Sequence, residues 1–316
     1  MTISGRQAGR IAQEIGHQLQ GQRDQEVEQF KAGKLEPRVE TRPALAVVGV
    51  DGGRLQIRGE GDGPGSHDPS WREDKIALLA TARNTACDSD PEPDLPDCFR
   101  DRKFVEKLVR GISGEGPMSP DDAGSPANFV PTPADEPATT RERPELLVRT
   151  YTASTCTSEE FGPMVAAEAQ RRNFMNAAHK VFLGDGSAWI WKLQERWFPT
   201  FEAVVDFLHA MGHVYGAAKA AETEAEKRWT LFLEWAEACW KGQAGKVIEH
   251  LRALQDAQGP LQEADIKGLA EDDPRKIFHQ ELVYMENNQE RMDYPRYRRL
   301  GLPWTTSHVE STVKIL

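Results

Sequence analysis

The chain has 316 residues, 39% of them hydrophobic, and a formal net charge of −11, so it can bury a full core and is not a natively unfolded protein. No apolar run approaches the roughly 18 residues that a membrane span needs, and the polar N-terminus lacks a signal-peptide apolar region. We therefore expect a cytoplasmic protein with no membrane partner. The four cysteines lie far apart without zinc-ligand spacing, which indicates reduced thiols.

The negative charge is concentrated in one stretch. Residues 88 to 145 contain 14 Asp and Glu against 7 Lys and Arg, which accounts for −7 of the −11 and leaves about −4 for the rest. A protein that contacts nucleic-acid phosphates normally needs a basic surface. Because the acidity is local, the composition does not exclude a basic face elsewhere.

The N-terminal part begins with a predicted helix over residues 4 to 30, with Ser4 as its cap and Ile11, Ile15 and Leu19 along a packing face. LAVVGV (45 to 50) and RLQIRG (54 to 59) predict two antiparallel strands joined at Asp51-Gly52-Gly53. Residues 71 to 83 predict a helix. A short amphipathic segment follows around residues 104 to 112, and residues 113 to 143 have the composition of a disordered linker.

The rest of the chain alternates strands and helices. Strands are predicted at 145 to 155, at HKVFLGDG (179 to 186) and at 200 to 207; helices are predicted at 159 to 178, from about 188, and over 217 to 258. In the last of these, an apolar stripe that includes Trp229, Phe232 and Trp240 indicates core packing. This alternation, with a leading hairpin, predicts an α/β fold with a mixed sheet flanked by helices.

Two aspartates stand at the ends of predicted buried strands. Asp51 ends the first apolar run and Asp185 ends HKVFLG, and each is followed by glycine. Carboxylate oxygens are the ligands that hard divalent cations prefer, so the pair suggests a metal site. Asp-Gly is also ordinary turn chemistry, and that interpretation stays open for each residue.

Three further acids or histidines are candidates. Glu310 could be a third metal ligand, although it also fits a capping box with Ser307 or a pair with Lys314. Asp206 and His209 form a D-x-x-H element beside a strand end, where the histidine could contact phosphate, orient a ligand, or simply cap a turn. His213, one helical turn later, is predicted to pack.

Arginine and tyrosine alternate near the C-terminus. Such a mixture suits phosphates and unstacked bases, although it also fits a solvated helix face. Arg54 and Arg58, beside Asp51, are weaker candidates for phosphate contact. The predicted DNA-contacting residues of the C-terminal stretch are Arg291, Arg296, Arg298, Arg299 and Tyr297, with Tyr294 between them.

Five ordered stretches of the sequence resemble bacterial insertion-sequence transposases of the ISKra type. They are VDGGRLQIR (50 to 58), WREDKIALL (71 to 79), HKVFLGDGSAWIWKLQERWFP (179 to 199), VVDFLHAMGHVYGAAKA (204 to 220) and YMENNQERMDYPRYRRLGLPWTTSHVESTVK (284 to 314). The resemblance implies a ribonuclease H-like catalytic domain of the DDE class. It also implies Asp51 as a ligand bridging two Mg²⁺ (or Mn²⁺) ions, with Asp185 and Glu310 completing the catalytic triad.

The same resemblance implies Mg²⁺-dependent DNA strand cleavage and strand transfer, with transposon ends and target DNA as partners and a homo-oligomer assembled on DNA. The expected organisation is an N-terminal helical segment (1 to 40), a catalytic core (41 to 216), a helical insertion (217 to 300) and the start of a catalytic helix (301 to 316). Both ends look shortened relative to the family, so weak activity is expected. The alternatives are an inactive remnant that only binds DNA or a full-length partner, and a metal-dependent phosphohydrolase.

Overall fold

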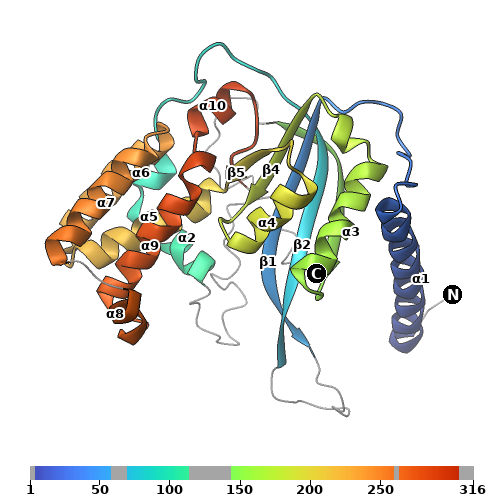
Figure 1. The fold of residues 1–316 in the computed structure, drawn as a ribbon, viewed down its shortest axis with the longest axis horizontal. Coiled ribbons are helices and arrows are strands. Elements are labelled where there is room, and N and C mark those ends of the chain that lie inside the picture. The colour runs from blue at the N-terminus through green and yellow to red at the C-terminus, as the bar shows by residue number, and fades with distance from the viewer. Residues whose placement is uncertain (1–3, 58–69, 114–143, 260–262, 306–316) are drawn as a thin grey trace.

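The computed structural model describes residues 4–57, 70–113, 144–259 and 263–305 (Figure 1). Its strands are β1 Leu45–Ile57, β2 Ser70–Arg83, β3 Glu145–Ser154, β4 His179–Gly184 and β5 Glu202–Val205. Its α-helices are α1 Gly5–Lys31, α2 Arg102–Ser113, α3 Ser158–Arg171, α4 Ala188–Trp197, α5 Phe207–Ala221, α6 Ala225–Trp240, α7 Ala244–Gln258, α8 Glu263–Gly268, α9 Pro274–Asn288 and α10 Tyr294–Arg299.

The five strands form one mixed sheet in the order β3-β2-β1-β4-β5. β2 is antiparallel to both of its neighbours, whereas β4 runs parallel to β1 and β5 runs parallel to β4. Helices α3 and α4 lie on one side of the sheet, and α2, α5 and α9 lie on the other (Figure 1). The predicted α/β class with a mixed, helix-flanked sheet is therefore confirmed.

Two details of the leading hairpin were predicted wrongly. β1 is one continuous strand through Asp51-Gly52-Gly53, so these residues do not form the turn, and residues 71–83 are the partner strand β2 instead of a helix. The segment Ile76–Ala82 is rich in alanine and leucine, which favour helices in isolation. Pairing with β1 on one edge and β3 on the other buries it, and this tertiary context overrides the local preference.

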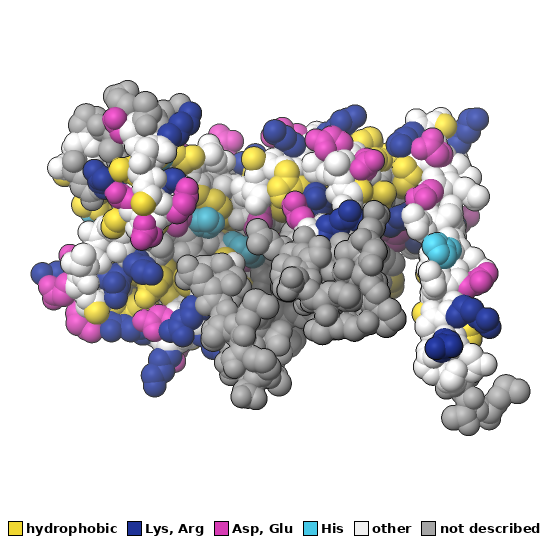
Figure 2. Space-filling model, turned by 90° about the horizontal axis from the view of Figure 1, so that it is seen from below, with side chains coloured by type: hydrophobic (Ala, Val, Ile, Leu, Met, Phe, Trp, Pro, Cys, Tyr) yellow, Lys and Arg dark blue, Asp and Glu magenta, His cyan; other side chains and the backbone are white. Residues whose placement is uncertain are grey.

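Helix α1 forms as predicted, with a capping box at Ser4. Its expected packing face, however, is exposed: Ile11, Ile15 and Leu19 are 48, 50 and 61% accessible. Only the C-terminal part of the helix packs, where Val27 is buried against α3. The space-filling view accordingly shows α1 standing off from the body of the protein (Figure 2).

One continuous hydrophobic cluster joins the sheet to the helices that follow it. It contains the strand residues Val48 and Phe182 together with Trp240 and Phe278 of the C-terminal helices. The predicted core role of Trp240 and Phe232 is confirmed, since both are fully buried. The helices after β5 are thus packed on the same core that positions β1 and β4.

None of the helices in the described ranges has the length and apolar character needed to cross a bilayer.

Candidate active site

Three aspartates lie in one row across the parallel strands. β1 pairs with β4 at a constant offset, from Leu45 with His179 to Gly49 with Leu183. The same offset places Asp51 beside Asp185, one residue beyond the last residue of β4. The register of β4 with β5, in which Gly184 pairs with Val205, places Asp206 next in the row. The structure therefore brings together two aspartates that are 134 residues apart in the sequence.

A cleft of about 440 Å³ opens at this row. Its walls come from the middle of β1, from the turn that follows β4, and from three helices on the α5 side of the sheet. The lining residues are Asp51, Gly52, Ile112, Asp185, Gly186, Ser187, His209, Gly212, His213 and Tyr284. Among the described residues on the face seen in Figure 2, acidic and basic side chains are interspersed.

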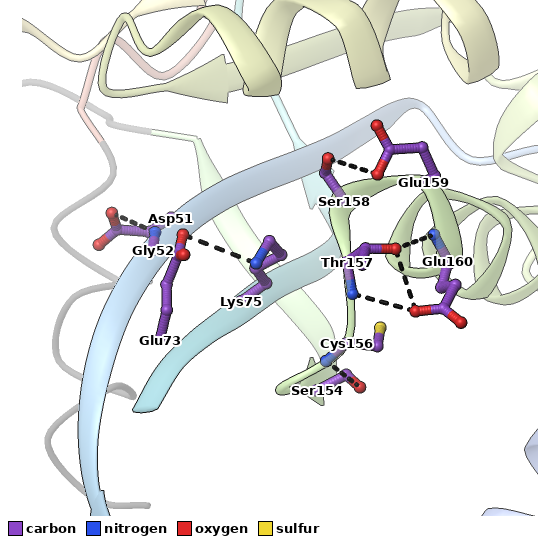
Figure 3. Close-up of polar contacts among 10 residues, drawn as sticks. All are labelled: Asp51, Gly52, Glu73, Lys75, Ser154, Cys156, Thr157, Ser158, Glu159 and Glu160. Atoms are coloured by element: carbon purple, nitrogen blue, oxygen red, sulfur yellow. Dashed lines mark hydrogen bonds and ion pairs between the residues drawn. The ribbon is translucent and has the colours of Figure 1, made fainter. Parts of the chain in front are cut away.

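Asp51 points into this cleft because side chains alternate along a strand. Its neighbour Gly52 pairs with Lys75 and faces Trp189 of α4 on the other side of the sheet. Figure 3 shows Asp51 directed away from Lys75 and from the start of α3. The Asp51 Oδ1 accepts a hydrogen bond from the Gly52 N–H at 2.8 Å.

The electrostatic setting of Asp51 disfavours its charged form. Its pKa is raised to about 6, mainly by burial; the nearby carboxylates of Asp185 and Asp206 also raise it, whereas His209 and the hydrogen bond from Gly52 lower it. Acids held close together in a cleft are costly when ionised and unpaired. A divalent cation between them would remove that cost.

Asp185 is held by a local turn before α4. Its Oδ1 accepts the Ser187 N–H at 2.7 Å and its Oδ2 accepts the Ser187 hydroxyl at 3.0 Å. The turn interpretation of this Asp-Gly is therefore realised. A carboxylate has about four acceptor sites, however, so both oxygens keep capacity for a further ligand.

One face of α9 holds the same turn from the opposite side. The Tyr284 hydroxyl donates to the backbone oxygen of Asp185 at 2.8 Å, and the Asn288 amide donates to the backbone oxygen of Gly186 at 3.3 Å. The Trp191 indole in turn donates to Asn288 at 2.7 Å. The helix that follows the sheet in sequence thus fixes the position of a candidate metal ligand.

The turn requires glycine at position 186, so replacing Gly186 should destabilise the protein. It has φ +104, and a Cβ here would collide with the Tyr284 ring. We expect Gly186→Ala to lower the free energy of unfolding by about 2 kcal/mol or more, because both the strained backbone and the clash must be accommodated. Urea unfolding measures this. Gly16→Ala, in α1 with open space around it, should be neutral or stabilising; equal losses in both variants would contradict the assignment.

Two histidines on α5 border the cleft, each near a carboxylate. The His209 Nδ1 lies 3.6 Å from Oδ2 of Asp206, which is fully buried and whose Oδ1 caps α5 by accepting the Leu208 N–H. The His213 Nδ1 lies 2.5 Å from Oε2 of Glu281 on α9. His213 was predicted only to pack. It does stack on Tyr284, and it also lines the cleft.

Two of the predicted metal ligands lie together among the described residues. Asp51 and Asp185 have the hard oxygen donors that Mg²⁺ prefers. Within the described ranges, no set of three His, Cys, Asp or Glu side chains is placed to hold a metal ion. The predicted third ligand, Glu310, lies outside the described residues. Its role stays a prediction.

The predicted DNA contacts of the C-terminal arginine-tyrosine stretch are wrong for Tyr297 and Arg298. Both are buried, at 0 and 5% exposure. The Tyr297 hydroxyl donates to Ala203 of β5, and Arg298 makes a two-pronged ion pair with Asp90. Helix α10 covers the free edge of β5, which explains why this polar stretch is internal.

The remaining predicted contacts differ in exposure. Arg296 is engaged by both carboxylate oxygens of Glu202, and the Arg291 guanidinium lies 4.6 Å from the Trp191 ring centroid. Arg299 is exposed. The side chain of Arg54 and all of Arg58 lie outside the described part of the chain.

Sequence patterns did not single out Glu281 and Tyr284 as parts of the site. Their spacing on α9, together with Asn288, places them on one helical face. That pattern alone does not distinguish residues that line a site from residues that pack in the core.

Comparison of the chain with protein-family models, with curated proteins and with solved structures found no match.

Proposed function

We propose that this chain is a DDE-type transposase that cleaves and joins DNA strands with Mg²⁺. The observation that carries the proposal is the placement of Asp51, within β1, in register beside Asp185, which directly follows the parallel strand β4, at one cleft. The mixed sheet, with an antiparallel hairpin leading into parallel strands, supports a ribonuclease H-like core. The resemblance to ISKra-type transposases motivates DNA as the substrate.

The residues of the cleft suit phosphodiester chemistry. Two Mg²⁺ ions, when bound, would activate the attacking oxygen and stabilise the leaving oxygen. Asp51 and Asp185 would hold them, with Glu310 as the predicted third carboxylate. Asp206 holds the start of α5, and therefore orients His209 toward the row of acids. The cleft and the fixed Asp185 turn together confine the reacting groups.

The direct test is nicking of supercoiled plasmid DNA by the purified chain with Mg²⁺ and with EDTA. We expect Mg²⁺-dependent nicking that Asp185→Asn reduces to background, because the amide keeps the turn's shape but not the ligand charge. Asp256→Asn, at an exposed position on α7, is the matched control and should retain full activity. Equal nicking by wild type and Asp185→Asn would refute the proposed catalytic site.

The phosphohydrolase alternative predicts a different result in the same preparation. The cleft is small, with a volume of about 440 Å³, which also suits a compact phosphate monoester. Hydrolysis of p-nitrophenyl phosphate that depends on Asp185, without plasmid nicking, would favour that alternative. A chain that binds DNA but cleaves neither substrate would favour the inactive remnant.

A further inference from the structure

His213 is held in a way that simple packing does not require. Its ring lies flat on Tyr284, with centroids 3.4 Å apart and an interplanar angle of 18°. Its Nδ1 is engaged by Glu281 at 2.5 Å, which leaves Nε2 as the ring nitrogen available to a ligand in the cleft. A stacked phenyl ring would fill the same volume without a carboxylate partner.

Glu281 makes the arrangement more specific. Its side chain is only 16% exposed, and a carboxylate withdrawn from water needs a compensating donor. It approaches His213 across the α5–α9 contact, beside Gly216, where a Cβ would be too close to the Glu281 carboxylate. The two helices are therefore fitted around this pair. An imidazole fixed through one nitrogen presents the other in a defined direction.

The charge of the cleft indicates what Nε2 would meet. Among the described lining residues, His209 and His213 are the side chains that can carry positive charge, and Asp51 and Asp185 are the acids. His209 lies against Asp206, within the row of aspartates. His213 is tied instead to α9. His213 is therefore better placed to bind an anionic substrate than to contact the acids that would bind a metal.

We propose that His213 is a substrate-binding residue, whose Nε2 donates a hydrogen bond to a non-bridging phosphate oxygen of the DNA strand in the cleft. Glu281 and Tyr284 are its positioning residues. This inference rests on the proposed function, since it requires a phosphodiester in the cleft. It assigns His213 no role as a metal ligand, so replacing His213 should weaken DNA binding without changing the response to Mg²⁺.

The test compares variants that preserve the packing. Glu281→Gln combined with His213→Phe keeps the ring stacked on Tyr284 and leaves no unpaired carboxylate. Glu281→Gln alone keeps an acceptor for Nδ1. His250→Asn, at a histidine that accepts the Trp235 indole N–H in a separate hollow, is the remote control. The ligand is a short, labelled single-stranded DNA oligonucleotide, with Ca²⁺ replacing Mg²⁺ so that cleavage does not interfere.

We expect the double variant to bind the oligonucleotide about tenfold or more weakly than wild type, as for loss of one charge-assisted hydrogen bond. Its melting temperature and its stabilisation by Mg²⁺ should match those of Glu281→Gln. Unchanged oligonucleotide affinity would overturn the inference while leaving Asp185-dependent nicking, and so the proposed function, intact. Parallel losses of melting temperature and Mg²⁺ response would show a structural role instead. A wild-type chain that responds to Mg²⁺ but never binds DNA would overturn both.

Discussion

Asp51→Asn should abolish Mg²⁺-dependent DNA cleavage and, at the same time, stabilise the metal-free protein. Loss of cleavage follows from removing the charge that would hold the cation. The gain in stability follows from the burial of Asp51, with Asp185 and Asp206 nearby, which raises its pKa to about 6. A substitution that inactivates an enzyme and also stabilises its fold identifies a site whose charges repel one another until a ligand binds.

The sign of the pH effect follows from proton binding. Asp51 has a pKa of about 6 in the folded state, above its ordinary value of 3.8, so between these pH values the folded state holds a proton that the unfolded state has lost. Stability therefore falls as the pH rises from about 4 to 6, and the loss is complete above 6. The ionisation costs the folded state up to about 3 kcal/mol at neutral pH.

Thermal and urea unfolding at pH 4.5 and pH 7 measure this effect. In EDTA, the wild type should lose more stability between the two pH values than Asp51→Asn. Mg²⁺ should restore the wild type, by about 2.7 kcal/mol at a hundred times its dissociation constant, and leave the variant unchanged. Asp256→Asn should behave as wild type throughout. A Mg²⁺ response retained in Asp51→Asn would remove Asp51 from the metal site.

The parts of the fold that could be read from the sequence are those with a strong local signal. Helix α1 was predicted to within a residue because Ser4 forms its cap. Asp185 directly follows the last residue of β4, as the apolar run that stops at it predicts, whereas Asp51 lies within β1, which continues to Ile57. Their adjacency also depends on strand order, which no local pattern in the chain encodes.

The errors arose where two structures share one pattern. Residues 76 to 80 are all apolar, and a continuous apolar run does not distinguish a doubly covered strand from a buried helix. The prediction that the arginine-tyrosine stretch contacts DNA was wrong for the opposite reason. Its polar groups suggested a surface, yet Tyr294 and Tyr297 donate to Val205 and Ala203 on the edge of β5. A polar side chain needs hydrogen-bond partners, but the sequence does not show whether these partners lie in solvent or inside the protein.

Arg298→Ala should be among the most destabilising single substitutions in this chain. The guanidinium donates to both carboxylate oxygens of Asp90, at 2.9 and 2.5 Å, and to the backbone oxygen of Trp240 at 3.0 Å. It also lies 3.9 Å from the centroid of a Trp240 ring. Although burial raises the pKa of Asp90, the hydrogen bonds from Arg298 and from the Glu92 N–H, together with the charges of Arg298 and Arg299, hold it below its usual value. Removing Arg298 leaves that carboxylate without its buried partner.

We expect a loss of about 3–5 kcal/mol in the free energy of unfolding, the usual cost of breaking a buried ion pair from one side. Arg299→Ala, at the adjacent exposed position, should change it by less than about 0.5 kcal/mol. Arg298→Lys should fall between them, because lysine keeps the charge without the two-pronged geometry. Oligonucleotide affinity, measured on folded protein at low temperature, should be unchanged in Arg298→Lys. If it falls while stability is preserved, Arg298 contacts DNA after all, and its ion pair with Asp90 does not persist in the DNA-bound protein.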